Sequence, residues 1–352
     1  MLILAKVFNL KKSVSKRKIW MESFQRRDLL LRLESTRKGR FPPQREGESR
    51  SFSTSTPPVL HSWLVTGLID AEGCFNLIIT KSSSVLGWRV QARFVLELHA
   101  KDIQLLYQLK SFFSEVGTIT VQNNKKVARY SIVGLDDILK ILLPHFSNYP
   151  LQSFKKIDFL LWKNCVIIMS NKEHLTLKGI KKILSNKTAI NLGLPDTLKA
   201  AFPDIHPLDR PVYNPTDLLN PNWISGFITG DGSFNITINS KDQVNPKVCI
   251  TLHIREKLLL EKVQQSIGFG SIYTSGNKVD WIVFRIDQLL IIIPYFKTYP
   301  LGGLKAYNFN IWQEIVYLLK LKEHLTLEGL AKVKSSSGRP CCGTAGVKRT
   351  IK

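Results

Sequence analysis

Two acidic residues, Glu72 and Asp231, end two copies of one short sequence pattern that lie 159 positions apart. Each copy reads as an apolar helix rich in small residues that ends in an acid and a glycine and runs directly into a strand. Gly67 and Gly226 leave almost no side chain on one face, so the two helices could approach backbone to backbone. The two acids would then emerge side by side. Paired carboxylates at the base of a helix pair indicate a divalent metal ion held against phosphate.

The charge of the chain indicates the same kind of partner. The 352 residues carry a formal net charge of +23, which points to a polyanion, with nucleic acid first and an anionic membrane surface second. Hydrophobic content of 44% and aromatic content of 10% argue against general disorder. The longest apolar runs, such as 289–295 with Pro294 inside it, are too short to span a bilayer. We therefore expect no membrane partner.

The cysteines do not indicate a metal site. They are odd in number and show none of the Cys or His spacings typical of zinc. We expect a reducing compartment and a structural role, or none, for the five thiols, which are Cys74, Cys165, Cys249, Cys341 and Cys342.

Composition divides the chain into five segments. Residues 1–58 carry 14 Lys and Arg against five Asp and Glu and end in a run of Ser, Thr and Pro. This composition predicts a basic disordered leader, an organelle-targeting presequence or a DNA-contacting arm, and these readings stay open. Two domains follow at 59–186 and 219–335, separated by a proline-rich linker at 187–218. Residues 336–352 are expected to form a flexible tail.

A regular pattern begins at residue 61 and returns in the second half. Tyr149-Pro150-Leu151 recurs as Tyr299-Pro300-Leu301, and 172–177 recurs as 322–327, both after 150 positions. Asn220 and Pro221 are expected to cap and open the second motif helix. The fold class predicted is α+β, with two αββαββα units. After the motif helix, the first unit should have strands at 74–80 and 88–99, a helix at 101–113, a hairpin of 117–122 and 127–133, and helices at 135–146, 154–169 and 175–184.

Polar side chains alternate with apolar ones along the strands that follow the two acids. A sheet face of this composition can read base edges in the major groove of DNA, although a solvated strand would show the same alternation. The candidate DNA contacts are Cys74, Asn76, Ile78, Thr80, Arg89, Gln91 and Arg93 in the first half, and Ser233, Asn235, Thr237, Asn239 and Lys247 in the second.

The two motif stretches resemble the defining motif of the LAGLIDADG homing endonucleases, with the nine-residue motif at 65–73 and 224–232. The resemblance continues through the repeated Tyr-Pro-Leu and Lys-Glu-His-Leu-Thr segments and covers about 61–335. The sequence is most similar to the two-motif, single-chain branch found in fungal mitochondrial introns.

That resemblance implies two motif helices packed about a pseudo-twofold axis and two four-stranded sheets that form a saddle on DNA. It implies that Glu72 and Asp231 are catalytic acids that ligate Mg²⁺, with Ala71 and Gly230 in the same metal site and two or three divalent ions shared between the halves. The protein would be a monomer, a pseudo-dimer within one chain, working in the mitochondrion. It would cut a long asymmetric double-stranded DNA target, leave short 3′ overhangs and promote intron mobility.

The two halves are not identical in their chemistry. The second motif has Thr229 where the first has Asp70, a position that is not the metal ligand of the family. Because the catalytic acids also differ, we expect unequal cleavage rates for the two strands. Lys155 and Lys305 recur at matching positions and are counted as catalytic candidates that place positive charge near phosphate. The alternative for both is a lysine on a solvated helix face.

Other recurring residues are expected to be structural. Trp63 and Trp223 are predicted to anchor the core. The histidine pairs lie at strand or helix ends, where structural hydrogen bonding is favoured over proton transfer; they are His99 with His253 and His174 with His324.

Three functions remain compatible with these features. The first is a sequence-specific endonuclease that spreads its own intron. The second is a maturase that binds group I intron RNA and assists its folding, a role also known in the family. The third is a DNA-binding regulator without catalysis, which would predict neutral residues at 72 or 231. Intact acids favour the nuclease, because RNA chaperoning needs no metal ligands.

Overall fold

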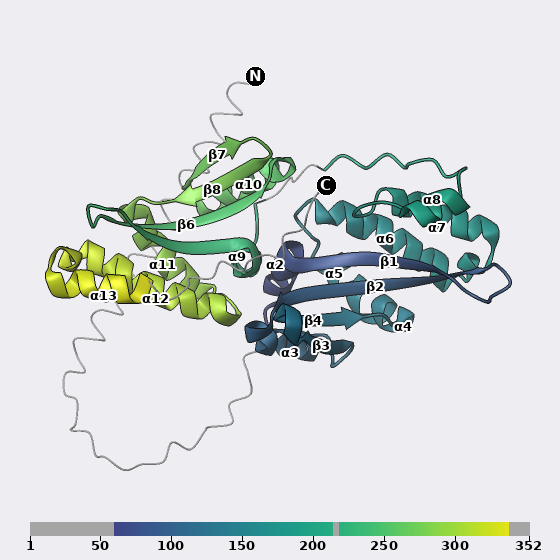
Figure 1. The fold of residues 1–352 in the computed structure, drawn as a ribbon, viewed down its shortest axis with the longest axis horizontal. Helices are drawn as coiled ribbons and strands as arrows, with labels where there is room; N and C mark the ends of the chain where they lie inside the picture. Colours follow the sequence, from purple (N-terminus) through teal and green to yellow (C-terminus); the bar gives the residue numbers. More distant parts are fainter. Residues whose placement is uncertain (1–59, 214–217, 338–352) are drawn as a thin grey trace, which may run out of the picture. The chain divides into compact units, whose positions relative to one another are not determined.

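The computed structural model describes residues 60–213 and 218–337. Figure 1 shows the two repeats, the first in purple to teal and the second in green to yellow. The predicted leader at 1–58 and most of the predicted tail lie outside the described residues. No helix in the described ranges is long and apolar enough to cross a membrane.

The first repeat contains the predicted elements, with small changes of boundary. The motif helix and the first strand pair are α2 (Ser62–Glu72), β1 (Gly73–Lys81) and β2 (Trp88–His99), followed by the 3₁₀ turn η1 (Ala100–Asp102) and α3 (Ile103–Phe112). The hairpin is β3 (Thr118–Gln122), η2 (Asn123–Lys125) and β4 (Val127–Ile132). The remaining helical elements are α4 (Leu135–Asp137), the π-helix η3 (Ile138–Leu142), α5 (Leu143–Asn148), α6 (Lys155–Ser170), η4 (Glu173–Leu175) and α7 (Leu177–Thr188).

The second repeat follows the same order. Its motif helix α9 (Pro221–Asp231) begins as predicted, with the Asn220 side chain accepting the N–H of Asn222 at 2.9 Å and Pro221 in the first turn. The other elements are β5 (Gly232–Ile238), β6 (Val244–His253), η5 (Ile254–Glu256), α10 (Lys257–Ile267), β7 (Ser271–Ser275), β8 (Lys278–Val283), α11 (Ile286–Thr298), α12 (Gly303–Lys320), η6 (Glu323–Leu325) and α13 (Leu327–Ser337).

Each repeat builds one antiparallel four-stranded sheet. The strand orders are β1-β2-β4-β3 and β5-β6-β8-β7, so the first strand of each repeat lies at a sheet edge. The register pairs Asn76 with Arg93 in the first sheet and Asn235 with Lys247 in the second. Because side chains alternate across a strand, these polar pairs share one face while the apolar residues face the helices. The α+β prediction with two repeated units is confirmed.

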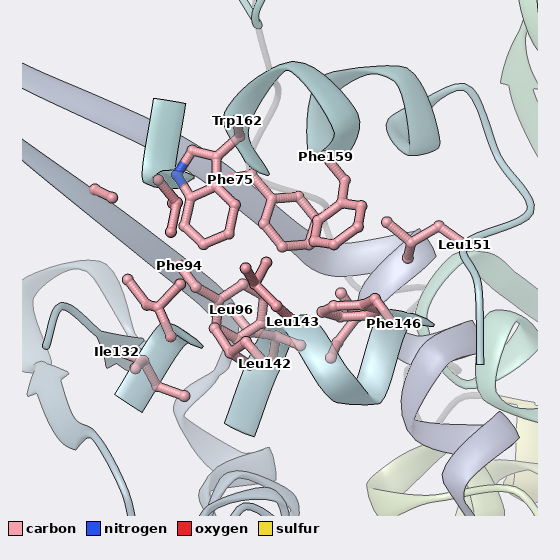
Figure 2. Packing of buried hydrophobic residues seen from close by; sticks show 14 of the residues in the cluster. Phe75, Phe94, Leu96, Ile132, Leu142, Leu143, Phe146, Leu151, Phe159 and Trp162 are labelled. Atoms are coloured by element: carbon pink, nitrogen blue, oxygen red, sulfur yellow. The ribbon is translucent and has the colours of Figure 1, made fainter. Parts of the chain in front are cut away.

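Aromatic rings fill the space between each sheet and its helices. In the first repeat the ring of Phe75 lies 5.1 to 5.5 Å from the rings of Phe94, Phe146, Phe159 and Trp162. Figure 2 shows these side chains converging between the strands and the helices that cover them. The second repeat has an equivalent cluster around Phe234. Each sheet is therefore fixed from its apolar face, and its polar face is left for other contacts.

The motif helices α2 and α9 pack directly on each other through their glycines. A Cβ added at Gly67 would overlap the carbonyl oxygen of Trp223 and lie 2.8 Å from the amide nitrogen of Phe227. A Cβ added at Gly226 would overlap the carbonyl oxygen of Leu64. The backbone-to-backbone approach expected from these two glycines is therefore present.

The segment between the two repeats is more ordered than its prolines suggest. Residues 187–218, predicted to be a linker, contain the short helix α8 (Asp196–Ala201). Leu194, Leu198 and Phe202 are buried with Ile180 and Leu184 of α7 in a small separate core. Their spacing of four residues is an apolar helical pattern that the proline content obscured.

A buried histidine should make the stability of the first repeat depend on pH. Nε2 of His145 lies 3.0 Å from the Thr66 hydroxyl, and burial lowers its pKa to about 4. The pKa of histidine in an unfolded chain is about 6.5, so the unfolded state binds more protons between these values. The contribution is therefore complete above pH 6.5, and the free energy of unfolding should fall by on the order of 2–3 kcal/mol as the pH drops towards 4.

Urea unfolding of the wild type and of His145→Gln at several pH values between 7 and 4.5 measures this contribution. The stability difference between the two proteins should change in favour of the variant as the pH falls. Parallel pH profiles would contradict the assignment.

Candidate active site and nucleic-acid interface

Glu72 and Asp231 are the last residues of α2 and α9, and each is followed at once by the glycine that begins a strand. At the base of the helix pair, a Cβ built on Gly230 would lie 3.0 Å from Cγ and 3.5 Å from Oε1 of Glu72. The Glu72 carboxylate of one repeat is therefore placed beside the last turn of the motif helix of the other. Gly230 leaves the space that this side chain occupies.

Lys305 connects the two acids electrostatically. Its side chain is 6% exposed, and its ammonium donates to the Gly232 carbonyl. Burial lowers the pKa of Lys305, while the carboxylates of Glu72 and Asp231 both oppose that shift. Both carboxylates therefore favour the charged form of the same buried ammonium.

Lys155 occupies the matching place in the first repeat. Its ammonium donates to the carbonyls of Ile69 at 3.0 Å and Ala71 at 3.1 Å, at the carboxyl end of α2. A cation is favourable at this end of a helix because the last carbonyls lack partners within the helix. Neither lysine lies on a solvated helix face, so the alternative reading for this pair is wrong.

Asp70 is a structural acid that joins the two repeats. Its carboxylate accepts hydrogen bonds from the amides of Gln152 (2.8 Å) and Ser153 (3.2 Å), from the Ser153 hydroxyl (2.5 Å) and from the indole Nε1 of Trp223 (2.8 Å). Burial raises the pKa of Asp70, and these donors oppose the rise. Thr229, its counterpart, accepts only the Gly302 amide, at 3.0 Å, and donates to Ser225. The difference between the motifs is therefore a difference in helix anchoring.

Asp70→Ala should destabilise the protein strongly. The change leaves the buried donors of Ser153 and Trp223 without an acceptor, and each unsatisfied buried donor costs about 1–3 kcal/mol. Asp70→Asn keeps one acceptor oxygen and should cost less. Urea unfolding measures both. Thr229→Ala is the matched control, with an expected loss of only about 1 kcal/mol for its neutral hydrogen bond. Equal losses at the two positions would contradict the anchoring role.

The predicted DNA contacts mostly share the polar faces of the two sheets. In the first sheet, cross-strand partners are Asn76 with Arg93, Ile78 with Gln91 and Thr80 with Arg89, and Cys74 lies beside Val95. In the second, Ser233 lies beside Cys249, Asn235 beside Lys247 and Thr237 beside Asn245. Nε of Arg93 is buried without a hydrogen-bond partner in the described part of the chain. The Nε donor of Arg93 is therefore not satisfied by the described residues of the protein.

Asn239 does not belong to this strand face. β5 ends at Ile238, and the Asn239 side-chain oxygen accepts the amides of Lys241 (3.0 Å) and Gln243 (2.9 Å) in the turn that follows. Asparagine satisfies backbone donors in turns readily, so local hydrogen bonding ended the alternation here. The position expected on the strand is therefore wrong, and the side chain holds the turn.

The strands β4 and β8, which lie third across their sheets, add polar residues that the sequence did not single out. Arg129 of β4 lies opposite Glu97 and pairs with it at 2.5 Å, and Asp280 of β8 accepts from Thr251 at 2.5 Å. Both pairs lie on the polar faces of their sheets. Their position there becomes clear only when the order and register of strand pairing are known. The alternation of 127–132 and 278–283 was the available signal.

Two of the four paired histidines have the structural role predicted for them. His99 Nδ1 accepts the Lys101 amide at 3.2 Å, and His253 Nδ1 accepts the Arg255 amide at 3.3 Å. Each histidine therefore caps the 3₁₀ turn after its strand. Nδ1 of His174 and Nδ1 of His324 are buried without a hydrogen-bond partner among the described residues. Trp223 is fully buried, as expected for a core anchor.

The donor set at the helix bases fits a hard divalent cation. Glu72 and Asp231 offer carboxylate oxygens, the ligands that Mg²⁺ and Ca²⁺ prefer. No cluster of three or more His, Cys, Asp or Glu side chains that could hold a metal occurs among residues 60–213 and 218–337. Further ligands would have to be water, main-chain or phosphate oxygens. Of the two predicted main-chain positions, the Ala71 carbonyl already accepts from Lys155.

The geometry defines a class of α+β proteins that are built from two repeats, each with a four-stranded sheet and a motif helix that ends in a carboxylate. The profile of the LAGLIDADG endonuclease family matches residues 65–166 and 224–316. The chain therefore belongs to this family, as the motif resemblance predicted.

Individual relatives agree with that placement. The chain is 36% identical over 314 residues to a Neurospora crassa protein described as probable intron-encoded endonuclease 3, covering 85% of this chain and 58% of that protein. It is 33% identical over 309 residues to probable intron-encoded endonuclease 2 of the same organism, covering 83% of this chain and 68% of that protein. The crystal structure of the I-SmaMI LAGLIDADG homing endonuclease bound to cleaved DNA matches with a TM-score of 0.76 at 36% identity, covering 79% of this chain and 96% of that chain.

Proposed function

We propose that this chain is a site-specific homing endonuclease that cuts both strands of a long, asymmetric DNA target in a Mg²⁺-dependent reaction. The observation that carries the proposal is the pairing of Glu72 and Asp231 at the base of two packed helices, beside the buried ammonium of Lys305. Relatives support it, because I-SmaMI structures hold cleaved DNA and, in another crystal, an uncleaved target with calcium ions. Short 3′ overhangs and intron mobility in the mitochondrion are parts of the same proposal.

The polar sheet faces would bind the DNA and set its position. Arg93, Gln91 and Lys247 offer donors to phosphate and to the acceptor-rich edges of purines. The two faces differ in sequence, since Arg93 faces Asn76 where Lys247 faces Asn235. Two different faces favour a target whose two halves also differ.

The residues at the helix bases would then carry the hydrolysis. A divalent cation held by Glu72 and Asp231 supplies positive charge to the scissile phosphate and lowers the pKa of an attacking water. Lys155 and Lys305 hold ammonium groups at the same helix ends, where they offset negative charge that develops on phosphate oxygens. The packed helices keep these groups in place before DNA arrives, which limits the cost of organising the site.

The experiment is incubation of the full chain with a strand-labelled duplex that spans the intron-free junction of its host gene. We expect double-strand cleavage in Mg²⁺ and none after chelation with EDTA, with activity restored when Mg²⁺ is returned in excess. The two strands should be cut at different rates because one site has Glu72 and the other Asp231. Cleavage that persists in EDTA would refute the metal-dependent function, and equal strand rates would refute the asymmetry.

A control separates this function from the RNA-binding alternative. The same protein is mixed with the group I intron transcript. Splicing of the transcript is then followed with and without the target DNA as a competitor. Acceleration of splicing without any DNA cleavage would replace the nuclease assignment with the maturase reading.

A further inference from the structure

Two short turns, η1 and η5, occupy matching places in the two repeats, at the end of the second strand. Each is capped by its own histidine, His99 or His253, and each ends in an acid, Asp102 or Glu256. The sequences read histidine, any residue, a basic residue and an acid in both cases. The turns are therefore built alike, and their acids point away from their own repeat.

Asp102 contacts the start of a helix in the second repeat. Its Oδ1 accepts the amide of Leu304 at 2.7 Å, in the first turn of α12. A Cβ added at Gly303, whose φ is +55°, would overlap this oxygen. The glycine thus admits the acid, and an unpaired amide in the first helical turn is satisfied from the opposite repeat.

Glu256 makes the reciprocal contact. Its Oε1 and Oε2 lie 3.2 and 3.1 Å from the amide of Phe154, which precedes the first residue of α6 in the first repeat. Burial raises the pKa of the Glu256 carboxyl to about 7. The guanidinium groups of Arg255 and Arg210 each lie 5.6 Å from the centre of the Phe154 ring, where cation–π attraction helps to hold the segment.

The residue after each of these amides is an active-site lysine. Lys155 follows Phe154, and Lys305 follows Leu304. Each lysine reaches the motif helix of its own repeat, while the backbone just before it is held by an acid of the other. The charges are coupled as well, because Asp102 supports the charged form of Lys305 and Lys155 supports that of Glu256.

We propose that Asp102 and Glu256 are positioning residues for the cleavage reaction, each fixing the helix start that carries the active-site lysine of the opposite repeat. The inference rests on the proposed nuclease function for its kinetic consequence. The structural part of the inference concerns the exposure of Lys155 and Lys305 and does not depend on that function. Neither repeat can place its own lysine correctly without the other.

The test compares Asp102→Ala and Glu256→Ala with the conservative Asp102→Asn and Glu256→Gln, which keep one acceptor oxygen. The control is Asp287→Ala, an exposed acid in the first turn of α11 that pairs with Arg285 of its own repeat. Lysine acetylation by an N-hydroxysuccinimide ester, quantified by mass spectrometry, reports each lysine without DNA. Single-turnover cleavage and DNA affinity in Ca²⁺ are measured on the same proteins.

We expect crosswise effects. Asp102→Ala should increase acetylation of Lys305 and not of Lys155, and Glu256→Ala should do the opposite. Single-turnover cleavage should fall by roughly 10- to 100-fold, as expected for misplaced active-site groups, with DNA affinity unchanged. The Asn and Gln variants should recover most of the rate, and Asp287→Ala should match the wild type.

Other outcomes overturn the proposal. Unchanged acetylation and unchanged cleavage in both alanine variants would remove the positioning role, as would increased acetylation confined to the lysine of the same repeat. If the alanine variants do not fold, Asp102→Glu and Glu256→Asp keep the charge but move the oxygen by one methylene, and they must still expose the opposite lysine. If the wild type cuts no DNA but the alanine variants still show the crosswise acetylation, only the nuclease function is refuted.

Discussion

Glu72→Gln is expected to lose double-strand cleavage by on the order of 10³-fold while binding its DNA target as tightly as the wild type. The amide has nearly the same shape as the carboxylate, so the packing beside Gly230 is preserved. It lacks the negative charge that a hard divalent cation requires. It also removes one of the two carboxylates that favour the charged form of Lys305. Asp231→Asn should have the same effect for the same reasons.

A strand-labelled substrate distinguishes complete loss of cleavage from loss of cleavage of one strand in these two variants. Any residual product should be a nick, because each repeat supplies one acid. DNA affinity is measured in Ca²⁺, and Glu115→Gln, an exposed acid that pairs with Lys110, serves as the control. Unchanged cutting by both Glu72→Gln and Asp231→Asn would remove these acids from the mechanism.

Gly226→Ala is expected to disrupt the contact between α2 and α9. The new Cβ would overlap the Leu64 carbonyl, a backbone atom that cannot rotate away as a side chain can. The helices must separate, at a cost of about 3 kcal/mol or more in the free energy of unfolding. Because the same helices carry Glu72 and Asp231, cleavage should fall further than stability alone explains. Gly67→Ala should act similarly, through overlap with the Trp223 carbonyl.

The control for the glycine variants is Gly276→Ala. Its φ is +53°, and an added Cβ meets nothing within 4 Å, so only backbone strain of about 1 kcal/mol is expected. Urea unfolding and cleavage are measured on all three proteins. A Gly226→Ala protein as stable and active as the control would show that α2 and α9 can separate freely. That result would contradict the close packing of the two helices.

Local patterns predicted most of the secondary structure because strands and amphipathic helices carry their periodicity in the sequence. The strand expected at 88–99 has those bounds in β2, and the hairpin across 123–126 was also predicted. The helix expected at 135–146 contains the π-helix Ile138–Leu142, followed by Pro144 in the first turn of α5. The matching proline of the second repeat, Pro294, lies inside the continuous helix α11, so proline alone does not explain the widened turn. No periodicity signals such a local change.

The candidate site was predictable only in part. The acid positions follow from the repeated motif, and the close helix approach follows from Gly67 and Gly226. The contacts of Asp102 and Glu256 join residues 202 and 102 positions away along the chain, so no local window contains both partners. Their repetition after His99 and His253 was visible, but its meaning depended on knowing that the two repeats face each other. The roles of Glu72, Asp231 and the sheet residues in catalysis and DNA contact remain predictions.

The Asp70–Trp223 hydrogen bond has a consequence for how the two halves can be recombined. The first half supplies the carboxylate and the second half supplies the indole, whereas Thr229 offers only a hydroxyl at the reciprocal position. Two second halves joined together would bury the indole N–H opposite threonine. The duplicated halves have thus become complementary and are no longer interchangeable. A chimera that borrows either half from a relative would need to bring a compatible acid and tryptophan across the seam.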